Sequence, residues 1–185
     1  MHPDREEPDM AYTLEQFCQD CHDALIADPG PAGRQRISAH LEQLLANADF
    51  VARHLSDQSQ GKTLLHHDPE TGFYAMAHGT DDGKTGKPHD HGASWAVYGQ
   101  ATGITNMSVW RHTDSGGAAD DAEIELERTF ALEPGHAALF DSHIIHSTAH
   151  PGKARWVRVT GTDLDTIERY SYDPERKTKK KMNAA

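Results

Sequence analysis

The sequence is poor in the residues that mark secreted, membrane-spanning or haem-bearing proteins. Only two of its 185 residues are cysteines, so a framework of several disulfide bonds is excluded. No apolar run approaches the ~18 residues that a transmembrane helix needs. The first residues are acidic and carry no apolar leader, so we expect a cytoplasmic protein that does not enter a membrane.

Basic residues are also in deficit. The chain has 18 Lys and Arg against 29 Asp and Glu, which gives a formal net charge of -11. Five of the basic residues lie within residues 175–181, so the rest of the chain is more acidic still. Nucleic-acid binding needs a basic surface, and we therefore exclude it. Residues 171–185 are expected to form a basic, flexible tail.

Residues 1–60 are expected to form a helical segment that packs on the remainder of the chain. Apolar residues recur at helical spacing over residues 13–27: Leu14, Phe17, Cys18, Cys21 and Leu25. This spacing places both cysteines on a buried helix face. It also argues against c-type haem attachment, although the order Cys-x-x-Cys-His at residues 18–22 has that literal pattern. Further helices are predicted over residues 34–46 and after Asn47 or Asp49, either of which could cap the third helix.

From residue 61 the pattern changes to short alternating segments separated by Gly, Pro and Asp. These predict strands at residues 63–67, 73–78, 94–98, 103–111, 123–132, 137–140, 144–149 and 154–161. Many short strands with turn residues between them favour an antiparallel barrel or jelly roll over residues 61–170. With the helical segment and the tail, we expect a single domain overall.

Histidines stand out within this predicted barrel. His89 and His91 are two residues apart, so in an extended segment both side chains point to the same side and can share one metal ion. A third ligand has to come from a distant strand, where His143 and His146 are the candidates. Because they are three residues apart, only one of them is expected to face the barrel interior. Three neutral imidazoles suit Fe(II), Zn, Ni, Mn or Cu.

Two glycine-framed motifs carry a resemblance to the cupin superfamily. They are Gly83-x5-His89-x-His91-x4-Ala96-x6-Gly103 and Gly135-x5-Asp141-x4-His146. The resemblance implies a double-stranded β-helix, with His89, His91 and His146 as metal ligands and His143 as the alternative third ligand. It also implies that Ala96 replaces the usual glutamate ligand, which leaves positions for substrate and dioxygen. Cupins commonly dimerise, so a homodimer is compatible with this assignment.

Within the cupins, residues 89–94 and 141–146 are similar to the thiol dioxygenases, the cysteine dioxygenase family. This resemblance implies bound Fe(II) and oxidation of a small thiol. The chain departs from the family pattern at three places. Ala96 stands where mammalian-type enzymes have a crosslinked cysteine, and residues 155–161 lack the histidine and tyrosine of the family's relay. Lys62 stands near the expected substrate-binding arginine, so cysteine itself is disfavoured as the substrate.

The function predicted from the sequence is a three-histidine Fe(II) cupin dioxygenase acting on a small organic substrate. The alternatives are a redox-neutral isomerase or lyase and a non-catalytic metal-binding cupin. Further site candidates follow from strand parity: Tyr98 as a proton donor, Arg111, Arg158 or Lys62 as a substrate anchor, and Trp95 as an apolar wall. Asp90 and Asp141 are candidates for orienting the histidine rings.

Overall fold

The computed structural model describes residues 11–56, 61–114 and 120–182. Residues 1–10 and 57–60 of the expected helical segment, and residues 183–185 of the expected tail, lie outside these ranges. Within the described residues, no helix is both long enough and apolar enough to cross a membrane.

Each of the three described helices begins at a recognisable start signal, either a capping side chain or a proline in the first turn. In α1 (Leu14–Ala27), Thr13 and Gln16 form a reciprocal capping box. Helix α2 (Pro31–Leu45) starts three residues earlier than predicted, because proline is well suited to the first helical position. Helix α3 (Ala48–His54) is capped by Asn47, whose side chain accepts hydrogen bonds from the next backbone amides.

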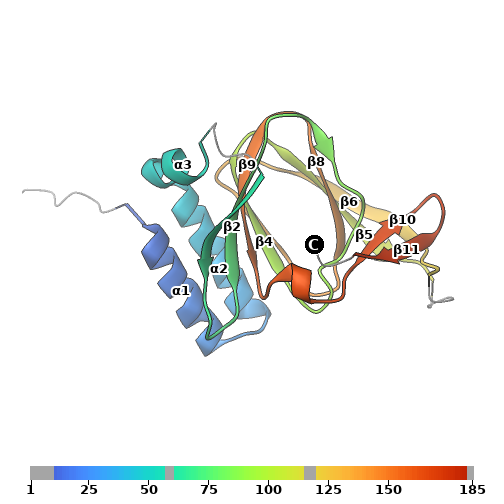
Figure 1. Cartoon of the computed structure of the whole chain (residues 1–185), viewed down its shortest axis with the longest axis horizontal. Coiled ribbons are helices and arrows are strands. Elements are labelled where there is room, and N and C mark those ends of the chain that lie inside the picture. The colour runs from blue at the N-terminus through green and yellow to red at the C-terminus, as the bar shows by residue number, and fades with distance from the viewer. Residues whose placement is uncertain (1–10, 57–60, 115–119, 183–185) are drawn as a thin grey trace, which may run out of the picture.

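Two antiparallel sheets form the barrel. The first has the order β1-β2-β9-β4-β7 and the second the order β3-β8-β5-β6. Their strands are β1 (Gly61–His67), β2 (Tyr74–Thr80), β3 (Lys84–Thr85), β4 (Ala96–Thr102), β5 (Thr105–His112), β6 (Ile124–Leu132), β7 (Ala137–Phe140), β8 (Ile145–His150) and β9 (Ala154–Thr160). Figure 1 shows the two sheets facing each other around a common interior. The predicted fold class, a mainly β double-stranded β-helix with an N-terminal helical segment, is confirmed.

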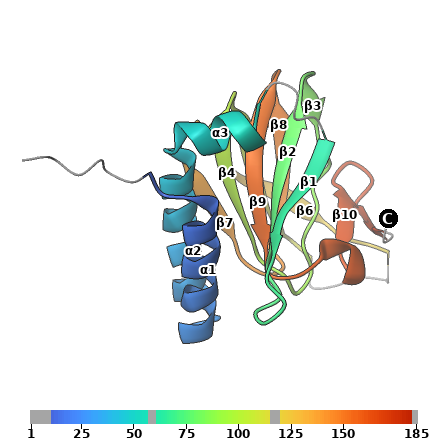
Figure 2. The ribbon, with the colours of Figure 1, turned by 60° about the vertical axis from the view of Figure 1, so that its left-hand side comes forward.

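The helices cover the outer face of the five-stranded sheet, as both ribbon views show (Figures 1 and 2). Alternate strand residues such as Val97, Val157 and Val159 join Phe17 and Leu41 of the helices in one buried core. The intervening residues of β4 and β9 point the other way, into the barrel. This alternation decides which side chains can reach a site in the barrel interior.

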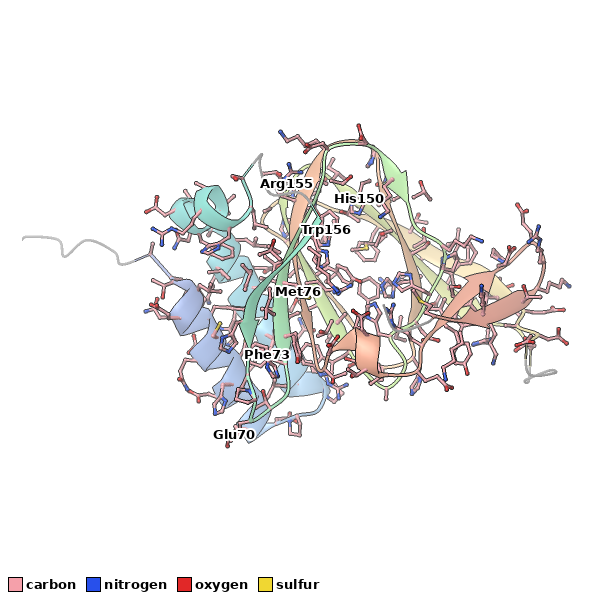
Figure 3. The ribbon with its side chains drawn as sticks, viewed as in Figure 1. Glu70, Phe73, Met76, His150, Arg155 and Trp156 are labelled. Carbon is pink, nitrogen blue, oxygen red and sulfur yellow. The ribbon has the colours of Figure 1, made fainter. Side chains whose placement is uncertain are left out.

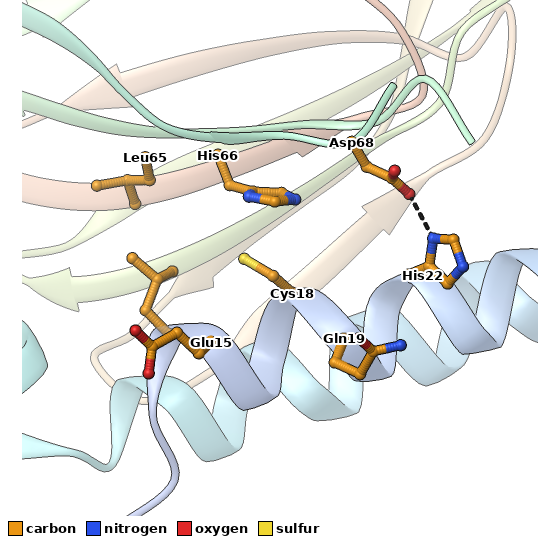
Figure 4. A pocket seen from close by; sticks show the side chains of 8 residues that line it. Glu15, Cys18, Gln19, His22, Leu65, His66 and Asp68 are labelled. Atoms are coloured by element: carbon orange, nitrogen blue, oxygen red, sulfur yellow. Dashed lines mark hydrogen bonds and ion pairs between the residues drawn. The ribbon is translucent and has the colours of Figure 1, made fainter. Parts of the chain in front are cut away.

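A groove of about 420 Å³ lies between α1 and β1, and Cys18 is one of the residues that line it (Figure 4). Both cysteines are buried free thiols, which confirms the prediction from helical spacing. Burial raises the pKa of Cys18 to about 12, so this thiol stays protonated and unreactive at neutral pH. His22 Nδ1 lies 2.8 Å from Asp68 Oδ2 and ties α1 to the β1–β2 turn. The residues of this groove therefore join α1 to the barrel, and we assign them no catalytic role.

The C-terminal residues differ from the prediction of a flexible tail. Tyr170–Asp173 (β10) and Thr178–Lys181 (β11) pair as an antiparallel hairpin on the side of the barrel away from the helices (Figure 1). Two ion pairs tie the hairpin's lysines to acidic residues, Lys177 to Glu123 and Lys181 to Glu168. Both ion pairs are exposed and contribute little to stability. Residues 171–182 nevertheless form a paired hairpin, contrary to the expectation of a flexible tail.

Candidate metal centre

The two histidine motifs meet through the backbone. His89 and His146 form an isolated antiparallel bridge, in which each amide donates to the other residue's carbonyl over 2.9 Å. His91 follows on the same side as His89, as its spacing predicts. The candidate ligand atoms of His89, His91 and His146 all lie within 4.8 Å of one another. The fold therefore brings together, in the barrel interior, residues that are more than 50 positions apart in sequence.

Backbone carbonyls orient two of the three rings. His89 Nδ1 lies 3.0 Å from the carbonyl oxygen of Lys87, and His146 Nδ1 lies 3.4 Å from that of Ile144. A carbonyl oxygen can only accept, so each Nδ1 must carry the hydrogen and each Nε2 presents its lone pair. This is the tautomer that a metal ion bound at Nε2 requires.

Burial keeps these imidazoles neutral. His91 is 3% exposed and His146 is fully buried. Loss of solvation lowers the pKa of His146 to about 3 and holds the pKa of His91 well below its ordinary value, with neighbouring histidines acting in the same direction. Burial also lowers the pKa of His89. Three uncharged rings with converging nitrogens fit a divalent transition metal.

Tyr98 and Phe140 complete the inner wall beside the histidines. The Tyr98 hydroxyl lies 3.3 Å from Nε2 of both His91 and His146. The Phe140 ring stacks on His146 with a centroid separation of 4.3 Å. Burial raises the pKa of Tyr98, against the opposing charge of Arg158, so the phenol keeps its proton. Ala96, fully buried in the same cluster, supplies no ligand atom.

A cavity of about 130 Å³ lies inside the barrel, and of the three candidate ligands His89 lines it. His89 and Tyr98 line one part of it, and Arg158 lines another. The remainder contains residues that sequence reasoning did not assign to the site, His78, His150 and Trp156, of which the last two stack at 4.4 Å (Figure 3). Strand parity could have found Trp156, because it lies two residues before Arg158 and shares its face.

Asp90 does not orient a histidine ring, contrary to the prediction. Its buried carboxylate accepts hydrogen bonds from the amides of Gly92 (2.9 Å) and Tyr170 (3.1 Å) and from the Tyr172 hydroxyl (2.6 Å). The backbone reinforces this link, since the amides of Tyr172 and Asp90 donate to the carbonyls of Pro88 and Tyr170. Asp90 therefore fastens the C-terminal hairpin to the loop that carries His89 and His91.

Replacing Tyr172 with phenylalanine should loosen this link. The change removes a hydrogen bond to a buried carboxylate, so we expect a loss of about 1.5 to 3 kcal/mol in the free energy of unfolding. Tyr170→Phe is the matched control, because its hydroxyl donates to Glu168 at an exposed position and should cost under about 1 kcal/mol. Urea unfolding of both variants measures the difference. Equal losses would contradict the role assigned to Asp90.

Other predicted site residues lie outside the barrel interior. Arg111 is exposed and pairs with Glu125, and Trp95 belongs to the core beneath the helices. Asp141 pairs with Arg34 over 2.7 Å and orients no histidine ring. His143 is exposed and adopts a positive φ of 64° in the turn before β8. The predictions that placed Arg111, Trp95 and Asp141 at the site were therefore wrong.

Lys62 lies at a neighbouring cavity. Its ammonium group is 3.3 Å from Asp165, which also pairs with Arg169 over 2.9 Å. Arg158 lines this second cavity as well, so its side chain lies between the two spaces. Of the predicted anchors, Arg158 alone lines the cavity next to the histidines.

The sequence matches no family model and no curated protein. Among solved structures, the chain is similar to an oxalate oxidase in complex with the substrate analogue glycolate (17% identity, 57% of this chain and 53% of that chain, TM-score 0.42). It is also similar to KdgF from Halomonas sp. (17% identity, 57% and 82% covered, TM-score 0.41). A third likeness is to a cupin superfamily protein from Desulfitobacterium hafniense DCB-2 (14% identity, 57% and 82% covered, TM-score 0.39).

The likeness thus spans about half the length of the oxalate oxidase. At these identities and TM-scores, none of the similar proteins carries an argument about the chemistry of this chain.

Proposed function

We propose that the chain is a metal-dependent oxidoreductase, a three-histidine Fe(II) cupin dioxygenase acting on a small organic substrate. The observation that carries the proposal is the convergence of three neutral imidazoles, one of which, His89, lines an internal cavity. The hydrogen-bonded Nδ1 atoms of His89 and His146 and the lowered pKa values of the rings are what a nitrogen-ligated divalent metal needs. Bound there, Fe(II) would supply open coordination positions at which a substrate and dioxygen react.

The surrounding residues suit such a reaction. Tyr98 keeps its proton and lies 3.3 Å from two candidate ligand nitrogens, so its hydroxyl is placed to donate a hydrogen bond or a proton to a ligand at the site. Phe140 and Met107 make the neighbouring wall apolar and keep water away from reactive groups. The side chains would therefore orient the substrate and donate a proton to it, while the metal supplies the redox chemistry.

The motif at residues 89–94 supports a thiol as one substrate class, in the manner of the cysteine dioxygenase-like proteins. The interior face of β9 argues against cysteine itself. It presents Trp156 and Arg158, so neither a histidine nor a tyrosine is available there for the family's relay. We therefore propose a dioxygenase of this general type with a different small substrate.

Anaerobic purification followed by elemental analysis and oxygen-uptake assays tests the proposal. We expect about one iron per chain, and iron-dependent oxygen consumption with at least one member of a panel of thiols, β-diketones and aromatic diols. The His146→Ala protein serves as the inactive control. Stoichiometric zinc without oxygen consumption would overturn the proposal and favour a redox-neutral isomerase or lyase.

A further inference from the structure

Strand β9 carries two arginines whose surroundings differ. Arg155 is fully buried, and its guanidinium group donates to the carbonyls of Ser56 (2.9 Å) and Thr80 (2.7 Å). It also pairs with Asp81 over 2.5 Å. These partners compensate its charge and give it a structural role at the end of the barrel. Arg158, three residues later, has the Tyr98 hydroxyl as a neighbour and, in the part of the chain that the structure describes, no carboxylate partner.

Arg158 points into the barrel, opposite Tyr98 on β4 and Met76 on β2. Its Nε is buried and makes no hydrogen bond. Among the described residues, no carboxylate forms an ion pair with it, since the nearby Asp165 is taken up by Lys62 and Arg169. Arg158 as a whole is only partly buried, and a partly desolvated cation without a counter-ion is well placed to bind an anionic group.

A second polar atom faces the same cavity without a partner. The Nε2 of His78 is buried and makes no hydrogen bond, while its ring stacks against Trp156. Burial lowers the pKa of His78 to about 3, so this ring is neutral and offers hydrogen bonding without charge. Two residues with unpartnered polar atoms that line one cavity leave hydrogen bonds for a bound molecule to make.

We propose that the cavity binds a small carboxylate, with the carboxylate group at Arg158 and the rest of the molecule directed toward the three histidines. The guanidinium fork matches a carboxylate in shape and charge. A space of about 130 Å³ admits only a molecule of a few heavy atoms. This inference deepens the proposed function by naming its substrate class, and it places the anchor on β9 and not at Lys62.

Titration of the protein with propionate and with its neutral counterpart propionamide, followed by NMR, tests the inference. The wild-type protein should bind propionate about tenfold more tightly than propionamide, and Arg158→Met should remove that preference. Arg111→Met removes a like charge from the outer surface and should leave both affinities unchanged. Equal binding of the two probes to the wild-type protein, or an unchanged preference in Arg158→Met, would overturn the inference.

Two further arms keep the result interpretable. If Arg158→Met does not fold, Arg158→Lys takes its place. This variant keeps the positive charge but loses the two parallel N–H donors of the guanidinium group. A weaker preference for propionate over propionamide would support the proposed carboxylate geometry, and an unchanged preference would contradict it. The titrations are run on chelator-treated and Zn(II)-loaded protein and need no turnover. Failure of the dioxygenase proposal would therefore leave anion binding intact, whereas loss of anion selectivity would leave the metal content intact.

Discussion

Replacing His146 with alanine should reduce bound metal from about one ion per chain to a small fraction of that value. The substitution removes one of three converging nitrogens and leaves a pair of imidazoles on a single loop. Loss of an outer hydrogen-bond partner of a ligand costs about 10- to 100-fold in metal affinity, so loss of the ligand itself should cost at least about 100-fold. Elemental analysis and competition with a chromogenic chelator measure the change.

His143 provides the matched control, because it is the same residue type three positions away. It is exposed in the turn before β8, and its positive φ of 64° suits asparagine better than alanine. The His143→Asn protein should therefore bind metal as the wild-type protein does. Metal loss in His143→Asn, with retention in His146→Ala, would show that the third ligand had been assigned to the wrong histidine.

The convergence of His89, His91 and His146 could be predicted from the sequence because the periodicity is simple there. His89 and His91 lie on one side of an extended segment, and the residue between them must point the other way. That rule also accounts for Asp90, which faces away from the centre and binds the C-terminal hairpin. The same parity separates Tyr98 from Trp95, which lies three residues earlier on the helix-facing side.

Parity fails where a strand is irregular. Thr105, Met107 and Val109 are buried along β5, so an unbroken strand would also turn Arg111 inward. The register between β5 and β6 shifts after Val109, where Glu127 of β6 has no partner across the ladder, and Arg111 lies on the surface beside Glu125. Such a bulge has no clear sequence signal here. Strand β9 pairs with β4 without irregularity around Arg158, which therefore stays inside the barrel.

The C-terminal hairpin could not be predicted from local pattern. Its second strand is rich in lysine, which is usual for solvated ends, and its stability comes from distant groups. Asp90, Pro88 and Glu123 lie 50 or more residues away in sequence from the hairpin residues they bind. Contacts at that separation depend on the barrel being formed, and the strand propensity of the segment itself is weak.

Replacing Gly92 with alanine should greatly lower the free energy of unfolding. Gly92 lies in the metal loop, the segment that carries His89 and His91. Gly92 has a positive φ of 53°, and an added Cβ would lie 2.0 Å from the carbonyl oxygen of Glu168. The chain must therefore move at the point where the hairpin segment crosses the loop. We expect a loss of about 3 kcal/mol or more in the free energy of unfolding, from left-handed strain together with overpacking.

Gly135 separates these two causes. Its φ of 86° is also positive, but an added Cβ would meet no atom within 4 Å. Gly135→Ala should therefore show the conformational cost alone, about 1 to 2 kcal/mol, and unchanged metal affinity. Gly92→Ala should lose more stability and should also bind metal less tightly, because Gly92 adjoins His91 and donates its amide to Asp90. Urea unfolding and chelator competition measure both quantities. Equal effects of the two substitutions would mean that the contact with residue 168 does not hold the metal loop in place.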